Sequence, residues 1–159
     1  MPHHDEPLLK RAIALSREHM EAGNGGPFGA LIADRSGTII AEGWNCVTTG
    51  NDPTAHAEVT AIRRACTALG RFDLKGHVIY SSCEPCPMCL AAIYWARLDR
   101  LVFANGRADA AAIGFDDALI YDEIPKPIEA RAIPTLHLPL KDGLDVFADW
   151  LKKPDKVPY

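Results

Sequence analysis

The spacing of apolar residues changes along the chain, and these changes predict where helices and strands lie. Within residues 8–20 the apolar residues recur with helical spacing, and glycines at 23, 25 and 26 end this pattern. Residues 28–34 and 38–44 are short β-type runs, and the turn-forming residues 35–37 between them predict a hairpin. Residues 48–54 are rich in turn formers and predict a loop.

Helical and extended patterns then alternate through the rest of the chain. Helices are expected at residues 55–70, 86–97, 116–124 and 143–151, and buried strands at residues 77–82 and 100–105. Residues 133–140 predict an edge strand, because Pro134 and Pro139 cannot donate to a β-ladder. Strands that alternate with helices predict an α/β fold with a mostly parallel sheet covered on both faces, and the opening hairpin makes the sheet mixed.

The length and composition narrow the class of protein. A chain of 159 residues with no linker or repeat predicts one domain spanning residues 1–159. The net charge of −4, without a dense basic run, argues against nucleic acid as a partner and favours a small-molecule substrate. The first eleven residues lack an apolar signal segment, and no apolar run reaches the roughly 20 residues of a membrane span, so we expect a soluble, cytoplasmic protein.

Cysteines are concentrated in one stretch, SSCEPCPMC, which contains three of the five in the chain. In a reducing compartment, clustered cysteines favour metal binding or catalysis over disulfides. Pro85 ends the preceding strand, so Cys86 and Cys89 are expected in the first turn of a helix, one turn apart on the same face. Cys83 stays on the strand side and is expected to be buried rather than to bind metal. Cys46 and Cys66 are expected to be buried as small apolar side chains.

A second motif, HAE, supplies the groups that complete a metal centre. His56 and Glu58 open the preceding helix, and in an α/β sheet both helix starts lie at the carboxyl edge of the strands. His56, Cys86 and Cys89 can therefore converge on zinc, and three protein ligands leave the open position of a catalytic site. Glu58 would lie beside the metal and transfer protons.

Other uses of these residues remain open at this point. A structural zinc site or a redox pair would also use Cys86 and Cys89, and a fourth protein ligand would indicate a purely structural zinc. However, the combination H-x-E…P-C-x-x-C matches the signature of zinc nucleobase deaminases. We therefore expect a catalytic zinc, one per chain.

Longer motifs resemble a known family. The chain is similar to the cytidine-deaminase-like fold and, within it, closely resembles the small bacterial guanine deaminases. This resemblance runs over nearly the whole chain and is carried by GGPFGA, NDPTAHAEVTAIR, SCEPCPMC, AIYWAR, GFDD, IYDEI and the terminal Tyr159. It implies a three-layer α/β/α sandwich with a five-stranded mixed sheet. It also implies zinc-dependent hydrolysis of guanine to xanthine and ammonia, as in purine catabolism or salvage.

The resemblance also implies a set of substrate contacts. In the family, an Asn hydrogen-bonds to the purine, aromatic residues pack around it, and an acidic residue contacts the guanine edge. A C-terminal tail exchanged between the subunits of a homodimer closes the pocket. The matching residues here are Asn45, Phe28, Trp95, Ala57, Asp117 and Tyr159, the last within a tail at residues 152–159 that would contact the partner subunit.

Each contact has a plainer alternative that the sequence leaves open. Asp117 suits guanine, whose N1–H and 2-amino group are donors, but it could instead cap the following helix. Asn45 could satisfy loop backbone, Phe28 and Trp95 could belong to the core, and the tail could be an ordinary solvated terminus.

Rival functions share the catalytic motifs. A tRNA adenosine deaminase would use the same zinc and glutamate but needs a basic track for phosphates, whereas the predicted pocket loop is acidic. A deaminase of guanosine, cytosine or another small aminated heterocycle would differ only in its pocket contacts. A zinc-stabilised binding module without turnover is the alternative of a different class.

Overall fold

The computed structural model describes residues 4–159 and divides the chain into two compact units. The first unit ends at Asp117 and the second comprises residues 118–159. No helix among the described residues is both long and apolar enough to cross a membrane.

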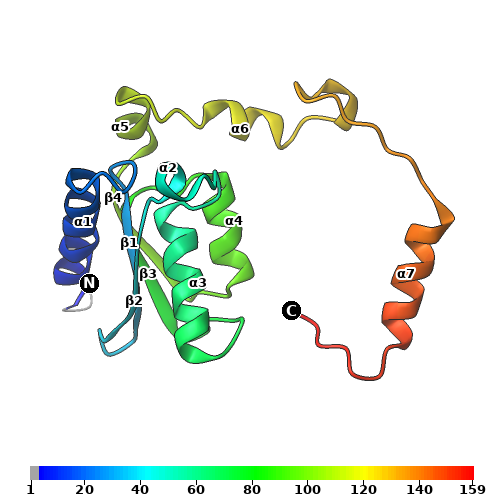
Figure 1. Ribbon diagram of the computed structural model, residues 1–159, viewed down its shortest axis with the longest axis horizontal. Helices are drawn as coiled ribbons and strands as arrows, with labels where there is room; N and C mark the ends of the chain where they lie inside the picture. Colours follow the sequence, from blue (N-terminus) through cyan, green and yellow to red (C-terminus); the bar gives the residue numbers. More distant parts are fainter. Residues whose placement is uncertain (1–3) are drawn as a thin grey trace. The chain divides into compact units, whose positions relative to one another are not determined.

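A four-stranded mixed sheet forms the centre of the first unit (Figure 1). Its strands are β1 (Gly29–Asp34), β2 (Ile39–Trp44), β3 (His77–Cys83) and β4 (Arg100–Asn105), in the order β2-β1-β3-β4. Strand β1 is antiparallel to both β2 and β3, whereas β3 and β4 are parallel. The predicted hairpin and the central strands are therefore confirmed.

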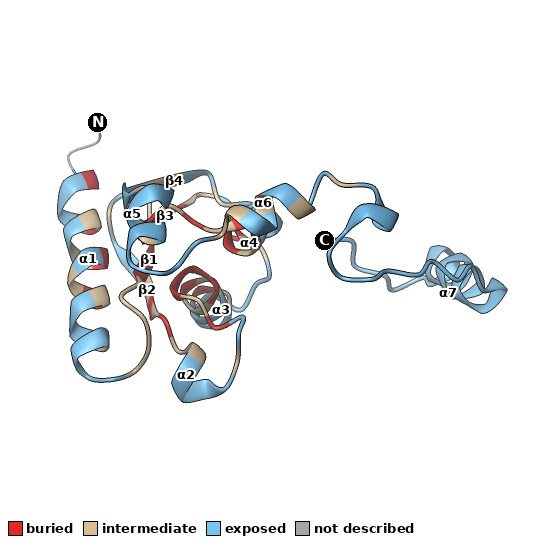
Figure 2. Ribbon diagram, turned by 90° about the horizontal axis from the view of Figure 1, so that it is seen from above, coloured by how far each residue is buried: buried red, intermediate tan, exposed pale blue. Residues whose placement is uncertain are grey.

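Helices cover both faces of this sheet, which confirms the predicted three-layer arrangement. Helix α1 (Asp5–Glu21) lies on one face, and α3 (Ala57–Leu69) and α4 (Pro87–Trp95) lie on the other (Figure 1). Buried residues line the strands and the inward sides of α1 and α3 (Figure 2). On the α1 face the core contains Leu8, Ala12, Leu15, Leu31, Ala33, Val78 and Tyr80. The α3/α4 face is built around Ala30, Ile32, Ala57, Ala61, Ala65, Leu74, Ile79, Ile93 and Ala96.

Small residues let α3 lie close to the sheet. A Cβ atom on Gly43 of β2 would come within 2.3 Å of the Ala57 carbonyl oxygen, so only glycine fits at this crossing. Gly70 ends α3 in the left-handed conformation at φ 63°, as its position in the sequence predicts. The start of α3, which carries the HAE motif, is thereby fixed against β2.

Two short helices of the first unit differ from the sequence predictions. Helix α2 (Val47–Gly50) occupies the beginning of the predicted loop. Helix α5 (Arg107–Ala112) follows β4 where no element was predicted. It is only six residues long and alanine-rich, so it lacks the apolar stripe by which longer helices are recognised.

The second unit contains α6 (Ala118–Glu123), a 3₁₀ turn (Ile128–Ala130) and α7 (Lys141–Lys152). Every residue of this unit is exposed or half-buried. Both helices agree with the sequence predictions, but the unit buries no core of its own.

The predicted strand at residues 133–140 is wrong, because this segment has no β-structure. Its two prolines lack N–H groups, and it belongs to the second unit rather than to the sheet. The sheet in the described residues therefore has four strands instead of five. It is also not mostly parallel, since only one of its three strand pairings is parallel.

Candidate active site

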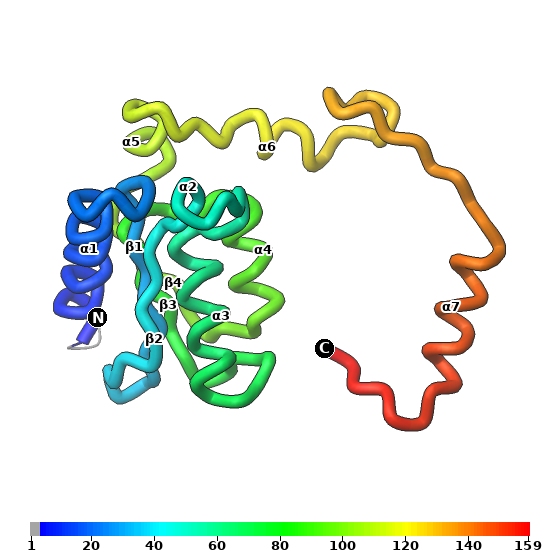
Figure 3. The backbone as a smooth tube through the Cα atoms, viewed as in Figure 1, coloured from blue at the N-terminus to red at the C-terminus, as the bar shows by residue number. Residues whose placement is uncertain are grey.

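One histidine and two cysteines converge where α3 and α4 begin. His56 immediately precedes α3, Cys86 immediately precedes α4, and Cys89 lies in the first turn of α4. The starts of these two helices lie at the same end of the sheet (Figure 3). The Nδ1 atom of His56 lies 3.6 Å from the Cys86 sulfur and 3.5 Å from the Cys89 sulfur.

These distances match those expected around a tetrahedral zinc ion. Bonds of about 2.1 Å to nitrogen and 2.3 Å to sulfur at a tetrahedral angle would separate the two ligand atoms by roughly 3.6 Å. The ligand atoms of all three residues lie within 4.8 Å of one another. No further His, Cys, Asp or Glu joins this group among the described residues. The cluster thus offers three ligands, which is the number found in catalytic sites.

The charges of the cluster also suit a divalent cation. A hydrogen bond from the Cys89 thiol, together with His56, holds the pKa of Cys86 far below its usual range. The neighbouring Cys86 and burial raise the pKa of Cys89. The contact with Cys86 raises the pKa of His56. One thiolate therefore opposes ionisation of the other, and a bound Zn²⁺ would remove this conflict by stabilising both anions.

Glu58 lies next to the cluster and is only 6% exposed. Burial, the largest influence, raises the pKa of its carboxyl group. The Ser81 hydroxyl donates a hydrogen bond to its Oε1 atom over 3.2 Å. A buried carboxyl group with a raised pKa beside a metal site has the properties of a proton-transfer group.

Asn45 is buried at the end of β2, and its side chain organises the neighbouring loop. Its Oδ1 atom accepts hydrogen bonds from the backbone N–H groups of Gly26 and Val47, both at 3.2 Å. A Cβ atom at Gly25 would lie 2.2 Å from the Asn45 carbonyl oxygen, which explains the glycine there. The side-chain oxygen of Asn45 therefore satisfies loop backbone, which was the alternative role expected for this residue. Its side-chain NH₂ group is the part that could reach a purine.

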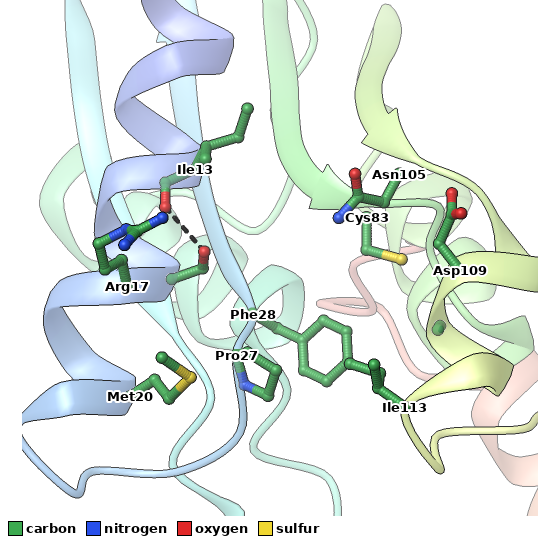
Figure 4. Close-up of a pocket in the computed structure, with 11 residues that line it drawn as sticks. Ile13, Arg17, Met20, Pro27, Phe28, Cys83, Asn105, Asp109 and Ile113 are labelled. Carbon is green, nitrogen blue, oxygen red and sulfur yellow. Dashed lines mark hydrogen bonds between the residues drawn. The ribbon is translucent and has the colours of Figure 1, made fainter.

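Phe28 packs edge-on against Phe115, with ring centroids 4.9 Å apart and planes at 88°. Its ring also borders a cavity of about 310 Å³ between α1, the end of β3 and α5 (Figure 4). Cys83 and Asn105 line the same cavity, whereas the three metal-ligand candidates do not. Phe28 therefore lines this cavity and also packs against the core on the α3/α4 face.

Asp117 is held by a neighbour that the sequence analysis did not identify. The Nε atom of Arg107 lies 3.5 Å from its Oδ1 atom. Arg107 opens α5, and its backbone N–H donates a hydrogen bond to the Glu84 carboxylate over 3.1 Å. The segment that carries the cysteines is thus linked to the segment that carries Asp117.

The remaining predicted contacts lie in different parts of the chain. Ala57 is fully buried directly after His56. Trp95 ends α4, nine residues after Cys86 and so roughly 13 Å along the helix axis. This distance along α4 means that the fold does not bring Trp95 to the metal cluster of its own chain. Its side chain is mostly exposed, and the centre of its ring lies 5.6 Å from the Arg97 guanidinium carbon. Tyr159 is exposed in the second unit.

Ser81 is the second residue that the sequence analysis missed. Strand alternation places residues 79, 81 and 83 on one face, and Ile79 belongs to the core that contains Ala57. That two-residue period was a usable signal for Ser81, because it indicates the face of β3 that meets α3. No comparable signal marks Arg107, whose contact depends on tertiary structure.

Comparisons with known proteins agree with this geometry. The family described as the cytidine and deoxycytidylate deaminase zinc-binding region matches residues 2–105. Guanine deaminase of Bacillus subtilis is 54% identical over 154 residues, which is 97% of this chain and 98% of that protein. Its X-ray structure matches with a TM-score of 0.95 over 100% of this chain and 99% of the other.

More distant relatives include two kinds of deaminase. A structure of guanine deaminase from Nitrosomonas europaea matches at 35% identity with a TM-score of 0.68, over 78% of this chain and 68% of that one. The tRNA-specific adenosine deaminase of Haemophilus influenzae is 38% identical over 71% of this chain and 68% of that protein. The chain therefore belongs to the zinc-binding cytidine and deoxycytidylate deaminase family, and the resemblance seen in its sequence motifs is confirmed.

Proposed function

We propose that this protein is a guanine deaminase that hydrolyses guanine to xanthine and ammonia with one zinc ion per chain. The observation that carries the proposal is the site in which His56, Cys86 and Cys89 surround a metal-sized position beside buried Glu58. The end-to-end similarity to the Bacillus subtilis enzyme supports the choice of guanine. Purine catabolism or salvage is the corresponding role in the cell.

The residues present divide the chemistry between binding and proton transfer. His56, Cys86 and Cys89 would hold the zinc, which when bound makes a water molecule acidic enough to act as a nucleophile near neutral pH. The Glu58 carboxylate accepts the proton of the attacking water and delivers it to the amino group that leaves C2 of guanine. The low exposure of Glu58 keeps bulk water from competing for this proton.

Substrate recognition falls to residues around this centre. The Asn45 amide would donate to the purine while its oxygen holds the loop, and Phe28 would pack on the ring. Ala57 would contact the base beside the metal. Asp117 would accept hydrogen bonds from N1–H and the 2-amino group, a donor pair that adenine lacks at these positions.

We also propose that the enzyme is a cytoplasmic homodimer with exchanged C-terminal segments. The second unit exposes large apolar residues and buries none, so residues 1–159 would form one complete domain only with a second copy. In this arrangement residues 152–159 contact the partner subunit, and Tyr159 closes the partner's pocket. Trp95, exposed at the end of α4, would contribute to a pocket wall near the subunit interface.

Turnover by the purified full-length chain tests the reaction and the substrate together. Guanine, guanosine, adenine, cytosine and a tRNA anticodon stem would be compared at equal concentration, with absorbance and released ammonia as readouts. We expect guanine to be converted to xanthine, and we expect chelation to stop the reaction. Conversion of another base while guanine is inert would contradict the assigned substrate but not the zinc chemistry.

A tRNA adenosine deaminase is the second candidate, because several such enzymes match roughly two thirds of the chain or more. Those matches reach 39% identity, against 54% for the guanine deaminase, and the chain carries a net charge of −4. Editing of the tRNA stem in the same assay would favour this function. Zinc bound at one ion per chain without turnover of any substrate would favour the binding module.

A further inference from the structure

The catalytic glutamate is contacted from the central strand of the sheet by Ser81. This serine lies near the end of β3, where its backbone is paired with Ala30 of β1 and Phe103 of β4. Its side chain points to the α3 face and donates to Glu58. Ser81 is 2% exposed, so water does not replace this hydrogen bond.

Glu58 is fixed at its backbone, and its carboxyl group is contacted by its own backbone N–H, by Cys89 and by the Ser81 hydroxyl. The close crossing of Gly43 and Ala57 locks the start of α3 onto β2. A glutamate side chain nevertheless retains rotamer freedom that the helix does not remove. The Ser81 hydroxyl binds one carboxyl oxygen, Oε1, which restricts the rotation of the group beside the metal position.

We propose that Ser81 is a positioning residue that orients the Glu58 carboxyl group for proton transfer. A hydroxyl group can donate a hydrogen bond to a carboxylate and accept one from a carboxylic acid. Ser81 can therefore hold Glu58 both before and after it takes up the proton. With Oε1 held by Ser81, the other carboxyl oxygen would exchange the proton with water and the leaving amine.

The next residue in the strand provides a matched control. Ser82 is also buried, at 4% exposure, but it points to the opposite face of β3. Its hydroxyl accepts a hydrogen bond from the Gly29 backbone N–H over 3.0 Å. Ser81 and Ser82 thus share residue type, strand and burial, and differ in whether they contact Glu58.

The experiment compares Ser81→Ala, Ser81→Thr and Ser82→Ala in the full-length zinc-loaded protein. Zinc content and thermal unfolding establish that each variant is folded and metallated. We expect Ser81→Ala to lower kcat about ten- to one-hundred-fold, with KM within about two-fold of the parent, as for other groups that orient an active-site ligand. Ser81→Thr keeps the hydroxyl and should restore kcat, whereas Ser82→Ala should lower the unfolding temperature and leave kcat nearly unchanged.

Several outcomes would overturn the inference. Ser81→Ala with the kcat of the parent would show that the hydrogen bond does not matter for turnover. An equal loss in Ser82→Ala, or a loss that follows zinc content, would assign the effect to packing or metal retention. Should Ser81→Ala not fold, the nearly isosteric Ser81→Cys, a weak donor, should give an intermediate kcat, and a parent-like kcat would count against the proposal.

This inference rests on the proposed deaminase chemistry, but the two can fail separately. The variants are assayed on whichever base the parent deaminates. A parent inactive on guanine but active on another base contradicts only the assigned substrate. A parent inactive on every base overturns both proposals, and a Ser81→Ala variant as active as its parent overturns this inference alone.

Discussion

The two units of the chain use the same kind of amphipathic helix with opposite results. In α1 of the first unit, Leu8, Ala12 and Leu15 recur at helical spacing and are all buried against the sheet. In α7 of the second unit, Leu144, Phe147 and Leu151 recur in the same way, yet each is about 70% exposed. Helical spacing therefore specifies a helix and its apolar face, but not the surface that covers this face.

The difference separates what each unit can contribute to function. The first unit holds the metal-ligand cluster, Glu58 and Ser81, and it buries its own core. The second unit supplies apolar surface and the terminal tyrosine. On the proposed function, the first unit carries the chemistry, and the second completes the pocket of a partner. The changes below test this division from the largest expected effect to the smallest.

Removal of zinc should have the largest effect on turnover, because the bound metal activates the attacking water in the proposed mechanism. The metal centre lies wholly within the first unit, so this change tests that unit alone. Dialysis against a chelator should abolish turnover, and added Zn²⁺ should restore it. The metal should also stabilise the fold by about 4 kcal/mol when free zinc exceeds its Kd a thousand-fold. Calorimetric unfolding with and without zinc checks this, and unchanged turnover in metal-free protein would contradict the catalytic role of the site.

Glu58→Gln should come next, since it removes the proton-transfer group and keeps its size. We expect kcat to fall about 10²- to 10⁴-fold with zinc content unchanged. Metal analysis beside steady-state kinetics makes the measurement. Glu84→Gln is the matched control from the cysteine segment, because the Glu84 carboxylate accepts the Arg107 backbone N–H outside the metal cluster. A Glu58→Gln enzyme as active as the parent would exclude the proton-transfer role.

Tyr159→Ala tests the contribution of the second unit. An aromatic ring stacked on a base contributes about 1–3 kcal/mol, so we expect kcat/KM for guanine to fall about ten- to one-hundred-fold. Val157→Ala, also exposed in the same tail, should have a much smaller effect.

Mixed dimers show whether that tyrosine acts in its own subunit or in the partner. Co-expression of Glu58→Gln with Tyr159→Ala should restore activity, because one site then combines an intact Glu58 with an intact tail from the other chain. If the tail acts within its own chain, neither site in the mixed dimer would be complete. Activity no greater than that of the two variants measured separately would then contradict tail exchange.

The sequence predicted the metal centre more completely than the pocket around it. His56, Glu58, Cys86 and Cys89 lie at helix starts, so short-range spacing and the α/β topology are enough to bring them together. The link between Asp117 and Arg107 depends on the placement of α5, a six-residue helix without an apolar stripe.

The expected strand at residues 133–140 failed for a related reason. Its alternating apolar residues fit a strand, but β-structure requires a neighbouring strand with free N–H and C=O groups. Residues 133–140 belong to the second unit and carry two prolines, and neither their β-type pattern nor any local signal specifies such a neighbour. Local patterns thus predicted the elements, whereas pairing between distant segments required the structure.

The smallest expected effect concerns stability alone and lies far from the chemistry. Asp5 begins α1 and is almost fully buried, where it accepts hydrogen bonds from Tyr80 at 2.8 Å and Arg100 at 3.0 Å. The Arg100 hydrogen bond lowers its pKa. Asp5→Asn should therefore reduce the free energy of unfolding by about 1–3 kcal/mol at neutral pH without changing kcat. Glu6→Gln, which breaks only the exposed pair with Lys10, is the control and should leave stability nearly unchanged.

The pH dependence of this difference identifies its cause. Because the pKa of Asp5 is lower in the folded than in the unfolded chain, its charge stabilises the fold fully only above the unfolded pKa of about 4. The stability gap between parent and Asp5→Asn should be constant from pH 8 to about 5 and should narrow as the pH falls through 4 toward the folded value. Denaturant unfolding of both proteins across this range measures the gap, and loss of zinc in acid affects both alike. A gap that stays constant down to pH 3 would mean that the loss comes from replacing an oxygen that accepts hydrogen bonds from Tyr80 and Arg100 by an amide NH₂ group, rather than from the charge of Asp5.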